Sequence, residues 1–186
     1  MSQPLASSGF RELSAPIFRL RPRGPRGLIP AMGETLAFRV DDLSDEKTRG
    51  LIVRHLAGMH ANSPPESVHA FDVEKLKQPG VTFWSAWLGP EIVCCGGLKR
   101  LDTTQGELKS MRVADAFLGR GFGRAMLEHL LGEARTLAMH NLWLETGSSA
   151  AFAPAIRLYE SAGFVRCGPF GGYVEDPFSI FMTRAL

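Results

Sequence analysis

Hydrophobic residues follow two kinds of spacing along this chain from about residue 34 onward. Where apolar residues recur at i, i+4 and i+7, as at Ile52, Leu56 and Met59, the spacing predicts one apolar face of an α-helix. Ser44 stands where an N-cap residue would begin this helix, and the prolines of NSPPES end it. We predict helices over residues 45–61, 73–78, 124–139 and 154–162.

Other segments are rich in β-branched, aromatic and aliphatic residues and are bounded by short Gly, Pro or polar turns, which predicts β-strands. Three of them follow one another closely, which indicates an antiparallel meander. Later strands alternate with helices. We therefore predict an α/β domain whose sheet is mixed and mostly antiparallel with flanking helices, the strands covering residues 34–43, 81–88, 91–101, 106–113, 141–146, 164–167 and 178–186.

Side chains alternate between the two faces of a strand, which makes two pairs of residues informative. Cys94 and Cys95 are adjacent, and Trp84 and Trp87 are three residues apart. We therefore expect the members of each pair on opposite faces of the sheet, with at least one tryptophan in the core.

The first 33 residues differ from the rest of the chain in composition. They are rich in Ser, Pro, Gly and Arg, and such a segment buries little apolar surface. We expect residues 1–33 to form a disordered N-terminal extension and residues 34–186 to form one domain. The extension holds five arginines and one glutamate while the whole chain carries a net charge of +2, so the domain itself is slightly acidic. This charge argues against nucleic acid as a partner.

Composition also limits where the protein works. No apolar run approaches the roughly 20 residues that span a bilayer, and no apolar signal-peptide core stands at the start of the chain. The three cysteines lack metal-binding spacing, and we expect reduced, mostly buried thiols. His55 and His60 are five residues apart, which puts them on different helix faces. We predict a cytoplasmic protein with no membrane partner and no metal.

The stretch FLGRGFGRAMLEHLL, residues 117–131, places three glycines directly before a helix and after a predicted strand. The first backbone N–H groups of a helix have no partner within the helix and carry the positive end of its dipole. Glycine lets an anion approach the main chain closely. Arg120 and Arg124 add positive charge nearby. The pattern predicts a phosphate-binding site, with a plain glycine-rich bend as the alternative.

A dinucleotide-binding enzyme is one alternative for this loop. The pattern G-x-G-x-x-G nearly fits from Gly119, but Arg124 stands at the third glycine position. Glu145, at the end of the next predicted strand, lies roughly where an acid that binds a nicotinamide ribose is expected. The antiparallel strands predicted upstream weigh against this alternative, because that fold begins with its βαβ unit.

The segment ELKSMRVADAFLGRGFGRAMLEHLL resembles the coenzyme A motif Q/R-x-x-G-x-G/A of the GNAT superfamily of N-acetyltransferases. Leu118 occupies the Q/R position, and Gly121 and Gly123 occupy the two small positions. The resemblance covers about residues 36–186 and is closest to a bacterial subgroup with an SPPESVHA segment and an ending like PFGGYVEDPFSIFM. A second match, AFAPAIRLYESAGF, resembles N-x-x-A-x-x-L-Y-x-x-x-G-F, with agreement at Ala155, Leu158, Tyr159, Gly163 and Phe164.

Two residues depart from the family pattern. Leu118 is neither Gln nor Arg, which removes a side-chain contact to the pyrophosphate of the coenzyme and leaves the backbone N–H groups. Phe152 stands where the family often has Asn. These departures keep open a second alternative, a non-enzymatic protein that binds coenzyme A as a sensor or interaction module.

The resemblance implies a GNAT-like acyl-CoA N-acyltransferase fold with acetyl-CoA as co-substrate. The strand before the loop splays from the next strand in this family, and the coenzyme's pantetheine arm lies in the gap. Tyr159 matches the family's general acid, which gives a proton to the leaving thiolate. The residues implied for coenzyme binding are Met111, Arg112, Val113, Leu118, Gly119, Arg120, Gly121, Phe122, Gly123, Arg124 and Tyr159.

The acceptor implied by the resemblance is a primary amine of a small molecule, an amino acid or a peptide. An alkyl amine is mostly protonated at neutral pH, so a carboxylate or a water chain must remove a proton. Glu107, at the start of a central strand, is the first candidate for this base, and Glu145 on the next strand is the second. Glu66, Ser67 and His69 are candidates for acceptor recognition. The resemblance also admits a homodimer.

Overall fold

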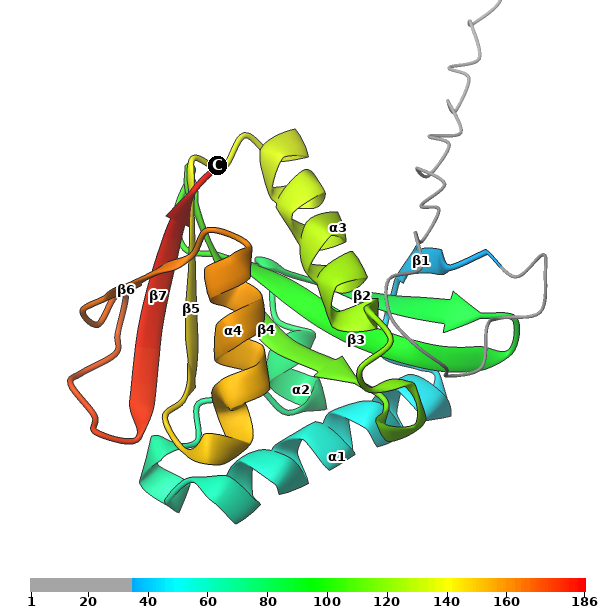
Figure 1. The fold of residues 1–186 in the computed structure, drawn as a ribbon. Helices are drawn as coiled ribbons and strands as arrows, with labels where there is room; N and C mark the ends of the chain where they lie inside the picture. Colours follow the sequence, from blue (N-terminus) through cyan, green and yellow to red (C-terminus); the bar gives the residue numbers. More distant parts are fainter. Residues whose placement is uncertain (1–34) are drawn as a thin grey trace, which may run out of the picture.

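A seven-stranded sheet with helices on both faces forms the part of the chain that the computed structural model describes, residues 35–186 (Figure 1). The predicted extension over residues 1–33 lies outside these described residues. Helices α1 to α4 span Glu46–Asn62, Val73–Leu76, Phe122–Thr136 and Ala153–Ser161, and single turns of 3₁₀-helix span Pro65–Ser67, Asp115–Phe117 and Ala150–Phe152. Strands β1 to β7 span Ala37–Val40, Val81–Leu88, Glu91–Arg100, Gln105–Val113, Asn141–Gly147, Val165–Cys167 and Ser179–Ala185.

The strands lie in the order β1-β2-β3-β4-β5-β7-β6. β2, β3 and β4 form the predicted antiparallel meander. Among the described strand pairs only β4 and β5 are parallel, and α3 makes the long connection that a parallel pair needs. The prediction of a mixed, mostly antiparallel sheet is confirmed.

Two hydrophobic clusters cover the two faces of the sheet. One cluster packs α3 and α4 against the sheet and contains Trp84 and Cys94. The other packs α1 and α2 against the opposite face and contains Trp87 and Cys95. Each predicted pair is therefore divided between the faces, and all four side chains are buried. We call these the α3 face and the α1 face.

The helix bounds differ from the predictions by up to three residues, and two of these differences have a clear cause. Asp45, not Ser44, is the N-cap of α1, because its carboxylate accepts hydrogen bonds from two backbone N–H groups of the first turn. Ser44 donates its hydroxyl to Asp42 instead, at 2.6 Å. α3 ends at Thr136, three residues earlier than predicted, and Ala138 takes a φ of 55° that a continuing helix does not adopt.

A β-bulge in β4 changes which face of the sheet its side chains point to. Between the pairs Cys95–Arg112 and Gly97–Lys109, one residue of β3 faces two residues of β4. Ser110, one of those two, has a φ of 51°, in the left-handed region. Because of this extra residue, Lys109 and Arg112 lie on the same face of the sheet although three positions separate them. That face is the α1 face, since cross-strand neighbours such as Cys95 and Arg112 share a face.

β4 and β5 separate toward their C-terminal ends. Their pairing ends at Leu108 and Leu144, although β4 continues to Val113 and β5 continues to Gly147. The backbone of β4 beyond Leu108 therefore lacks β5 as a ladder partner. This is the splayed pair of strands that the resemblance implies, and it opens a gap in the middle of the sheet.

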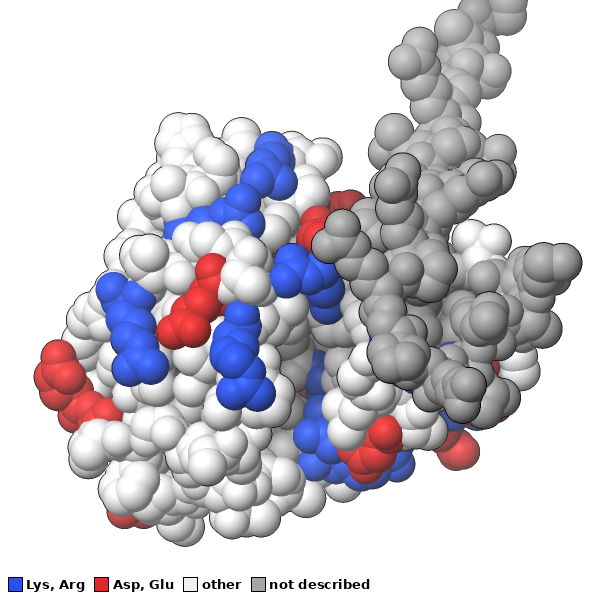
Figure 2. Space-filling model, in the orientation of Figure 1, with Lys and Arg blue, Asp and Glu red and all other residues white. Residues whose placement is uncertain are grey.

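Charged residues are dispersed over the face of the molecule that Figure 2 shows. Lys and Arg form separate patches there, with Asp and Glu between them. Within the described part of this face the patches do not join into the basic strip that binds nucleic acid. None of the helices within residues 35–186 has the length and hydropathy required to cross a membrane.

Candidate active site

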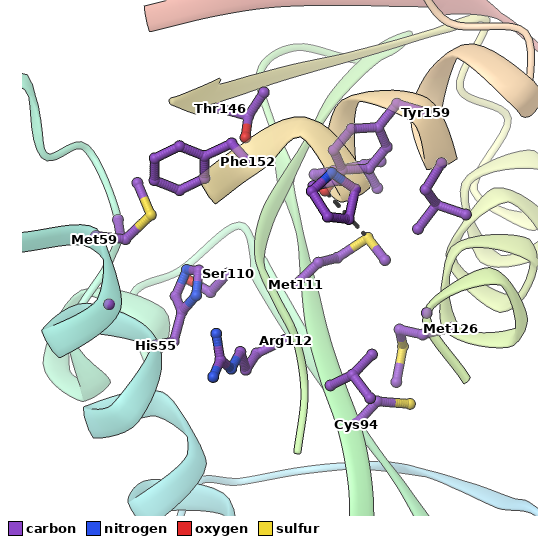
Figure 3. Close-up of a pocket in the computed structure, with 18 of the residues that line it drawn as sticks. His55, Met59, Cys94, Ser110, Met111, Arg112, Met126, Thr146, Phe152 and Tyr159 are labelled. Carbon is purple, nitrogen blue, oxygen red and sulfur yellow. Dashed lines mark hydrogen bonds between the residues drawn. The ribbon is translucent and has the colours of Figure 1, made fainter. Parts of the chain in front are cut away.

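A cavity of about 490 Å³ lies where β4 and β5 separate (Figure 3). β4 lines it from Leu108 to Val113, and β5 lines it through Glu145 and Thr146. α1 contributes one wall, while the loop before α3 and the start of α4 contribute another. One space therefore connects the glycine loop, the splayed strands and Tyr159.

The end of α3 that faces this cavity has no side-chain cap. Gly121 is the N-cap residue with a φ of 87°, and within residues 35–186 no side chain makes a capping hydrogen bond there. Gly119 has a φ of 71°, and a Cβ atom at this position would meet no described atom within 4 Å. The first N–H groups of α3 are thus available to a ligand, and their dipole favours an anion. The geometry fits a diphosphate.

Five residues predicted to bind the coenzyme through the loop and strand line the cavity. They are Met111, Val113, Leu118, Gly119 and Gly123, and Arg112 of the same predicted set lines the cavity as a sixth. Met111 and Val113 pack toward the α3 face. Leu118 is 58% exposed, so its apolar side chain lies at the surface beside the loop.

Four other residues of the predicted coenzyme set lie outside the cavity lining: Arg120, Gly121, Phe122 and Arg124. Phe122 is 2% exposed and holds the start of α3 against the core. The Arg120 guanidinium stacks over the Phe122 ring, 5.6 Å from its centroid. Arg124 donates to the Ser161 hydroxyl at 2.6 Å and so joins α3 to α4. The two arginines place positive charge beside the loop without forming the cavity wall.

Tyr159 reaches the cavity from α4. Its side chain is 8% exposed, and its hydroxyl lies 3.8 Å from the Met111 sulfur, a weak acceptor (Figure 3). Burial raises the pKa of this phenol, and the negative charge of Glu145 raises it further. The hydroxyl therefore keeps its proton at neutral pH and can donate it to an electron-rich atom in the cavity.

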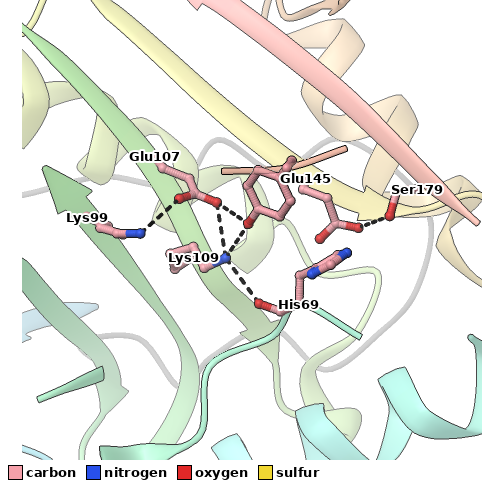
Figure 4. Close-up of polar contacts among 7 residues, drawn as sticks. His69, Lys99, Glu107, Lys109, Glu145 and Ser179 are labelled. Carbon is pink, nitrogen blue, oxygen red and sulfur yellow. Dashed lines mark hydrogen bonds and ion pairs between the residues drawn. The ribbon is translucent and has the colours of Figure 1, made fainter. Parts of the chain in front are cut away.

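Glu145 lines the cavity from β5 and is held in place by β7. Its Oε1 accepts a hydrogen bond from the Ser179 hydroxyl at 2.7 Å (Figure 4). Burial raises the pKa of Glu145, while the Ser179 hydrogen bond and the charges of His69 and Lys109 oppose that rise. A carboxylate with a raised pKa is a stronger base than an ordinary glutamate, which suits it to remove a proton.

Glu107, the first candidate for the base, does not line the cavity. It is 1% exposed and is engaged by three side chains (Figure 4). Lys109 donates to it at 3.1 Å and Tyr173 at 2.5 Å, while the Lys99 ammonium lies 3.9 Å away. These partners bind the carboxylate oxygens and keep the carboxylate out of the cavity. Of the two predicted candidates, Glu145 is the one with access to the cavity.

Lys109 and Tyr173 were not singled out from the sequence, yet they organise this part of the site. The buried Lys109 ammonium donates to Glu107, to the Tyr173 hydroxyl at 2.8 Å and to the His69 carbonyl at 3.2 Å. It also lies 4.4 Å from the centroid of the Phe71 ring. Burial and the Glu107 charge raise the pKa of Tyr173. The result is a buried ion pair between Lys109 and Glu107, and Tyr173 connects it by hydrogen bonds to the loop before β7.

The three predicted acceptor-binding residues have different positions. His69 lines the cavity, and its ring packs edge-on against Tyr173 with centroids 5.0 Å apart. Ser67 is buried and lies outside the cavity lining. The backbone N–H of Phe178 and, after it, the Ser67 side chain lower the pKa of Asp176. Glu66 is exposed and also lies outside the lining. Only His69 of the three faces the cavity, while Ser67 joins the loop after α1 to the loop before β7.

Phe152, which departs from the family pattern, forms part of the cavity wall. Its ring lies against the backbone at Gly147, where a Cβ atom would stand 2.2 Å from the ring. Figure 3 shows the ring between Met59 and Thr146. The phenyl group therefore replaces a polar contact with apolar packing and requires glycine at the end of β5.

Two buried thiols also reach the cavity. Burial raises the pKa of Cys94 to about 12 and raises that of Cys95 as well. Both therefore remain thiols at neutral pH, and neither is a nucleophile suited to covalent catalysis. Within the described residues no group of three or more His, Cys, Asp and Glu side chains is placed to hold a metal ion.

Comparison with known proteins identifies a family and relatives that this chain matches. Residues 49–164 match the acetyltransferase (GNAT) family. The chain is 49% identical over 148 residues to the uncharacterised N-acetyltransferase YsnE of Bacillus subtilis, covering 80% of this chain and 98% of that protein. It is 45% identical to the uncharacterised N-acetyltransferase YedL of Escherichia coli, covering 80% of this chain and 93% of that protein.

Solved structures share the fold. A structure from Klebsiella pneumoniae, described as an acyl-CoA N-acyltransferase, superposes with a TM-score of 0.67 and 25% identity, covering 81% of this chain and 97% of that one. A GNAT acetyltransferase of Elizabethkingia anophelis, solved with acetyl-CoA bound, gives a TM-score of 0.61 at 18% identity, covering 81% of this chain and 98% of that one.

Proposed function

This chain belongs to the acetyltransferase (GNAT) family and is an N-acetyltransferase, and we propose that it transfers the acetyl group of acetyl-CoA to a primary amine of a small molecule, amino acid or peptide. The observation that supports this best is the single cavity that joins the uncapped start of α3, the separated β4 and β5, and Tyr159. The dinucleotide alternative requires a leading βαβ unit, whereas an antiparallel meander precedes this loop.

The residues around the cavity fit the coenzyme in three places. The N–H groups at the start of α3 suit its diphosphate, and the open space beside Gly119 lets that group approach the backbone. The β4 backbone beyond Leu108 is free of β5 and suits hydrogen bonds to the pantetheine arm. When bound, the coenzyme supplies a thioester, which is an acetyl group activated for transfer.

Two residues then move protons. Glu145 takes a proton from the acceptor nitrogen as the new C–N bond forms at the acetyl carbon. The C–S bond breaks, and the Tyr159 hydroxyl donates to the leaving sulfur, which departs as a thiol. Both residues are restored by exchange with water. Their access to the cavity supports both roles, and burial supports that of Glu145 because it raises the pKa of this carboxyl group and makes it a stronger base.

Replacing Tyr159 with phenylalanine is expected to lower kcat by roughly 100-fold, the low end of the range that a positioned general acid contributes. The Kd of acetyl-CoA should stay nearly constant, since the ring remains in the α3-face cluster. Single-turnover measurement of acetyl transfer and calorimetric titration of acetyl-CoA separate the two effects. Turnover at the rate of the unaltered enzyme would remove Tyr159 from the mechanism.

Two glycines of α1 provide a matched pair of variants that tests whether α1 lines the part of the cavity that binds the acceptor. Gly58 lines the cavity and Gly50 does not. A Cβ atom at Gly58 would lie 3.9 Å from Arg112, and one at Gly50 would lie 3.7 Å from Arg54, both ordinary contacts. Each alanine variant should raise the free energy of unfolding by about 1 kcal/mol, because glycine weakens a helix interior.

Only Gly58→Ala should also raise the KM of the acceptor several-fold, because its methyl group takes space in the cavity. Thermal unfolding and acceptor-dependent kinetics of both variants check this expectation. Equal KM values for the two variants would place the acceptor away from α1.

The proposed function is tested by following thiol release from acetyl-CoA over a panel of amino acids, polyamines and peptide amines. We expect at least one class to be acetylated at its amine, with the product identified by mass spectrometry. Thiol release that no member of the panel accelerates would contradict the proposed reaction. A cytoplasmic location and a homodimer stay predictions from the sequence.

A further inference from the structure

The part of the cavity between β4 and α1 contains polar atoms that the protein leaves without partners. The Ser110 hydroxyl and the Arg112 Nε atom are buried and have no hydrogen-bond partner among the described residues. Ser110 is only 8% exposed, and both residues line the cavity. Buried polar groups are almost always paired, so unpaired donors in a cavity wall are positions where a polar group of a ligand can bind.

The fold brings these two side chains together with His55. The bulge in β4 turns Arg112 toward the α1 face, and its guanidinium would lie 3.9 Å from a Cβ atom placed on Gly58 of α1. His55 lines the cavity one turn earlier on the same helix. Figure 3 shows His55, Ser110 and Arg112 next to one another between α1 and β4. A ligand group placed there meets a hydroxyl, a guanidinium and an imidazole.

The charges around this position favour an anion. Arg112 is paired through Nη2 with Asp115, whose side chain is 62% exposed and outside the cavity lining. The Lys109 ammonium lies on the same face of β4, although Glu107 neutralises it. Burial, followed by the positive charges of Arg112 and Lys109, lowers the pKa of His55 to about 4, so this imidazole is neutral at pH 7. Arg112 keeps its Nε donor without a partner among the described residues and so can bind an anionic group here.

We propose that Arg112, Ser110 and His55 bind a carboxylate of the acceptor, so that the enzyme acetylates amines that also carry a carboxylate. This inference rests on the proposed function and narrows its substrate class. Guanidinium and hydroxyl donors match a carboxylate in number and geometry. Glu145, the acid in the cavity lining, takes the proton from the amine of the same molecule. Simple alkyl amines and polyamines lack the group that this subsite binds.

The test uses sets of three acceptors with one side chain: phenylalanine, phenylalaninamide and phenethylamine, with leucine and glutamate sets treated alike. The unaltered enzyme should show a kcat/KM for the acid roughly 10- to 100-fold above that for the amide, because a charge-assisted hydrogen bond contributes about this factor. Arg112→Gln should lower kcat/KM for the acid by a similar factor, chiefly through KM, and leave the amide nearly unchanged. Comparing variant with unaltered enzyme on one acceptor cancels the different amine pKa values of the three compounds.

Arg54→Gln is the matched control, since it removes the same charge from an exposed position on α1 outside the cavity lining. It should leave all three acceptors unaffected. Ser110→Gly is a second variant that tests the subsite without disturbing the charge. Glycine suits the φ of 51° at this position, so the variant should fold normally and still lose several-fold in kcat/KM on the acid. Titration with acetyl-CoA should give the same Kd for all variants, which separates an acceptor subsite from a coenzyme contact.

Equal use of acid and amide by the unaltered enzyme would overturn the carboxylate subsite while the N-acetyltransferase function stood. An increase in the Kd of acetyl-CoA in Arg112→Gln, with unchanged preference between acid and amide, would assign these residues to the coenzyme and would also overturn it. If no acceptor in any set were acetylated while a polyamine or peptide amine was, the carboxylate subsite would fail and the N-acetyltransferase function would stand; if none of these amines were acetylated, both would fail.

Discussion

Replacing Glu145 with glutamine will lower kcat by roughly 10²- to 10⁴-fold, the range that a positioned general base contributes. Glutamine keeps the shape of the side chain and can still accept from the Ser179 hydroxyl, so the fold of β5 should be preserved. Pre-steady-state measurement of acetyl transfer at saturating acetyl-CoA reports this loss directly. Glu160→Gln, an exposed change on α4 outside the cavity, is the control and should have the activity of the unaltered enzyme.

The pH profile distinguishes a base from a carboxylate that only binds substrate. A general base works in its deprotonated form, so kcat should fall as the pH drops through the pKa of Glu145. Because burial raises that pKa, the fall should begin at a higher pH than for an ordinary glutamate. Ser179→Ala removes a hydrogen bond that lowers the pKa, so it should move the acidic limb to still higher pH. An acidic limb that persists unchanged in Glu145→Gln would assign the base elsewhere.

Replacing Glu107 with glutamine will lower the free energy of unfolding by about 3–5 kcal/mol, because it leaves the Lys109 ammonium buried without its counter-charge. Lys109 is 5% exposed and Glu107 is 1% exposed, so water cannot replace the lost partner without opening the structure. Chemical denaturation, with the slope compared between variants, measures this change. The effect identifies Glu107 as a residue that holds the site together.

The double variant Glu107→Gln with Lys109→Met tests the cause of that loss. Removing the ammonium removes the unpaired buried charge, and the amide introduced at position 107 can still accept from the Tyr173 hydroxyl. The double variant should therefore recover a large part of the lost stability. If it were less stable than the single variant, the ion pair would not be the reason for the destabilisation. If Glu107→Gln were as stable as the unaltered chain and inactive, Glu107 rather than Glu145 would be the base.

The fold was predictable because its signals are local. Turns rich in glycine and polar residues bound the meander, and helical spacing marks α1 and α3. The glycine loop could be predicted to bind an anion because strand, glycines and helix start follow one another within residues 109–124. Tyr159 was identified from a motif of 14 residues, residues 151–164, all close in sequence.

The choice between Glu107 and Glu145 was not predictable, because it depends on contacts between residues far apart in the chain. Tyr173 donates a hydrogen bond to Glu107 from 66 positions further along the chain, and Ser179 donates one to Glu145 from 34 positions further along. Strand spacing alone gives the face of a carboxylate and not its neighbours across the sheet. The aromatic and polar residues of the segment before β7 were visible, but their docking onto β4 and β5 was not.

The residues proposed to bind the acceptor could not be predicted from the sequence because of the β-bulge in β4. Simple alternation along KSMRV puts Lys109 and Met111 on one face, whereas the extra residue at Ser110 puts Lys109 and Arg112 together. Nothing in the local sequence marks this bulge, since its positive φ falls on serine rather than glycine. For the same reason His55 had no visible partner until α1 was placed over β4.

The most direct test of the account is a crystal structure of this chain with acetyl-CoA. We expect the diphosphate against the backbone N–H groups of the first turn of α3, the pantetheine arm along β4 beyond Leu108, and the thioester between β4 and β5 within reach of the Tyr159 hydroxyl. A coenzyme bound elsewhere on the molecule, or a gap between these strands that stays filled by the protein's own side chains, would contradict it.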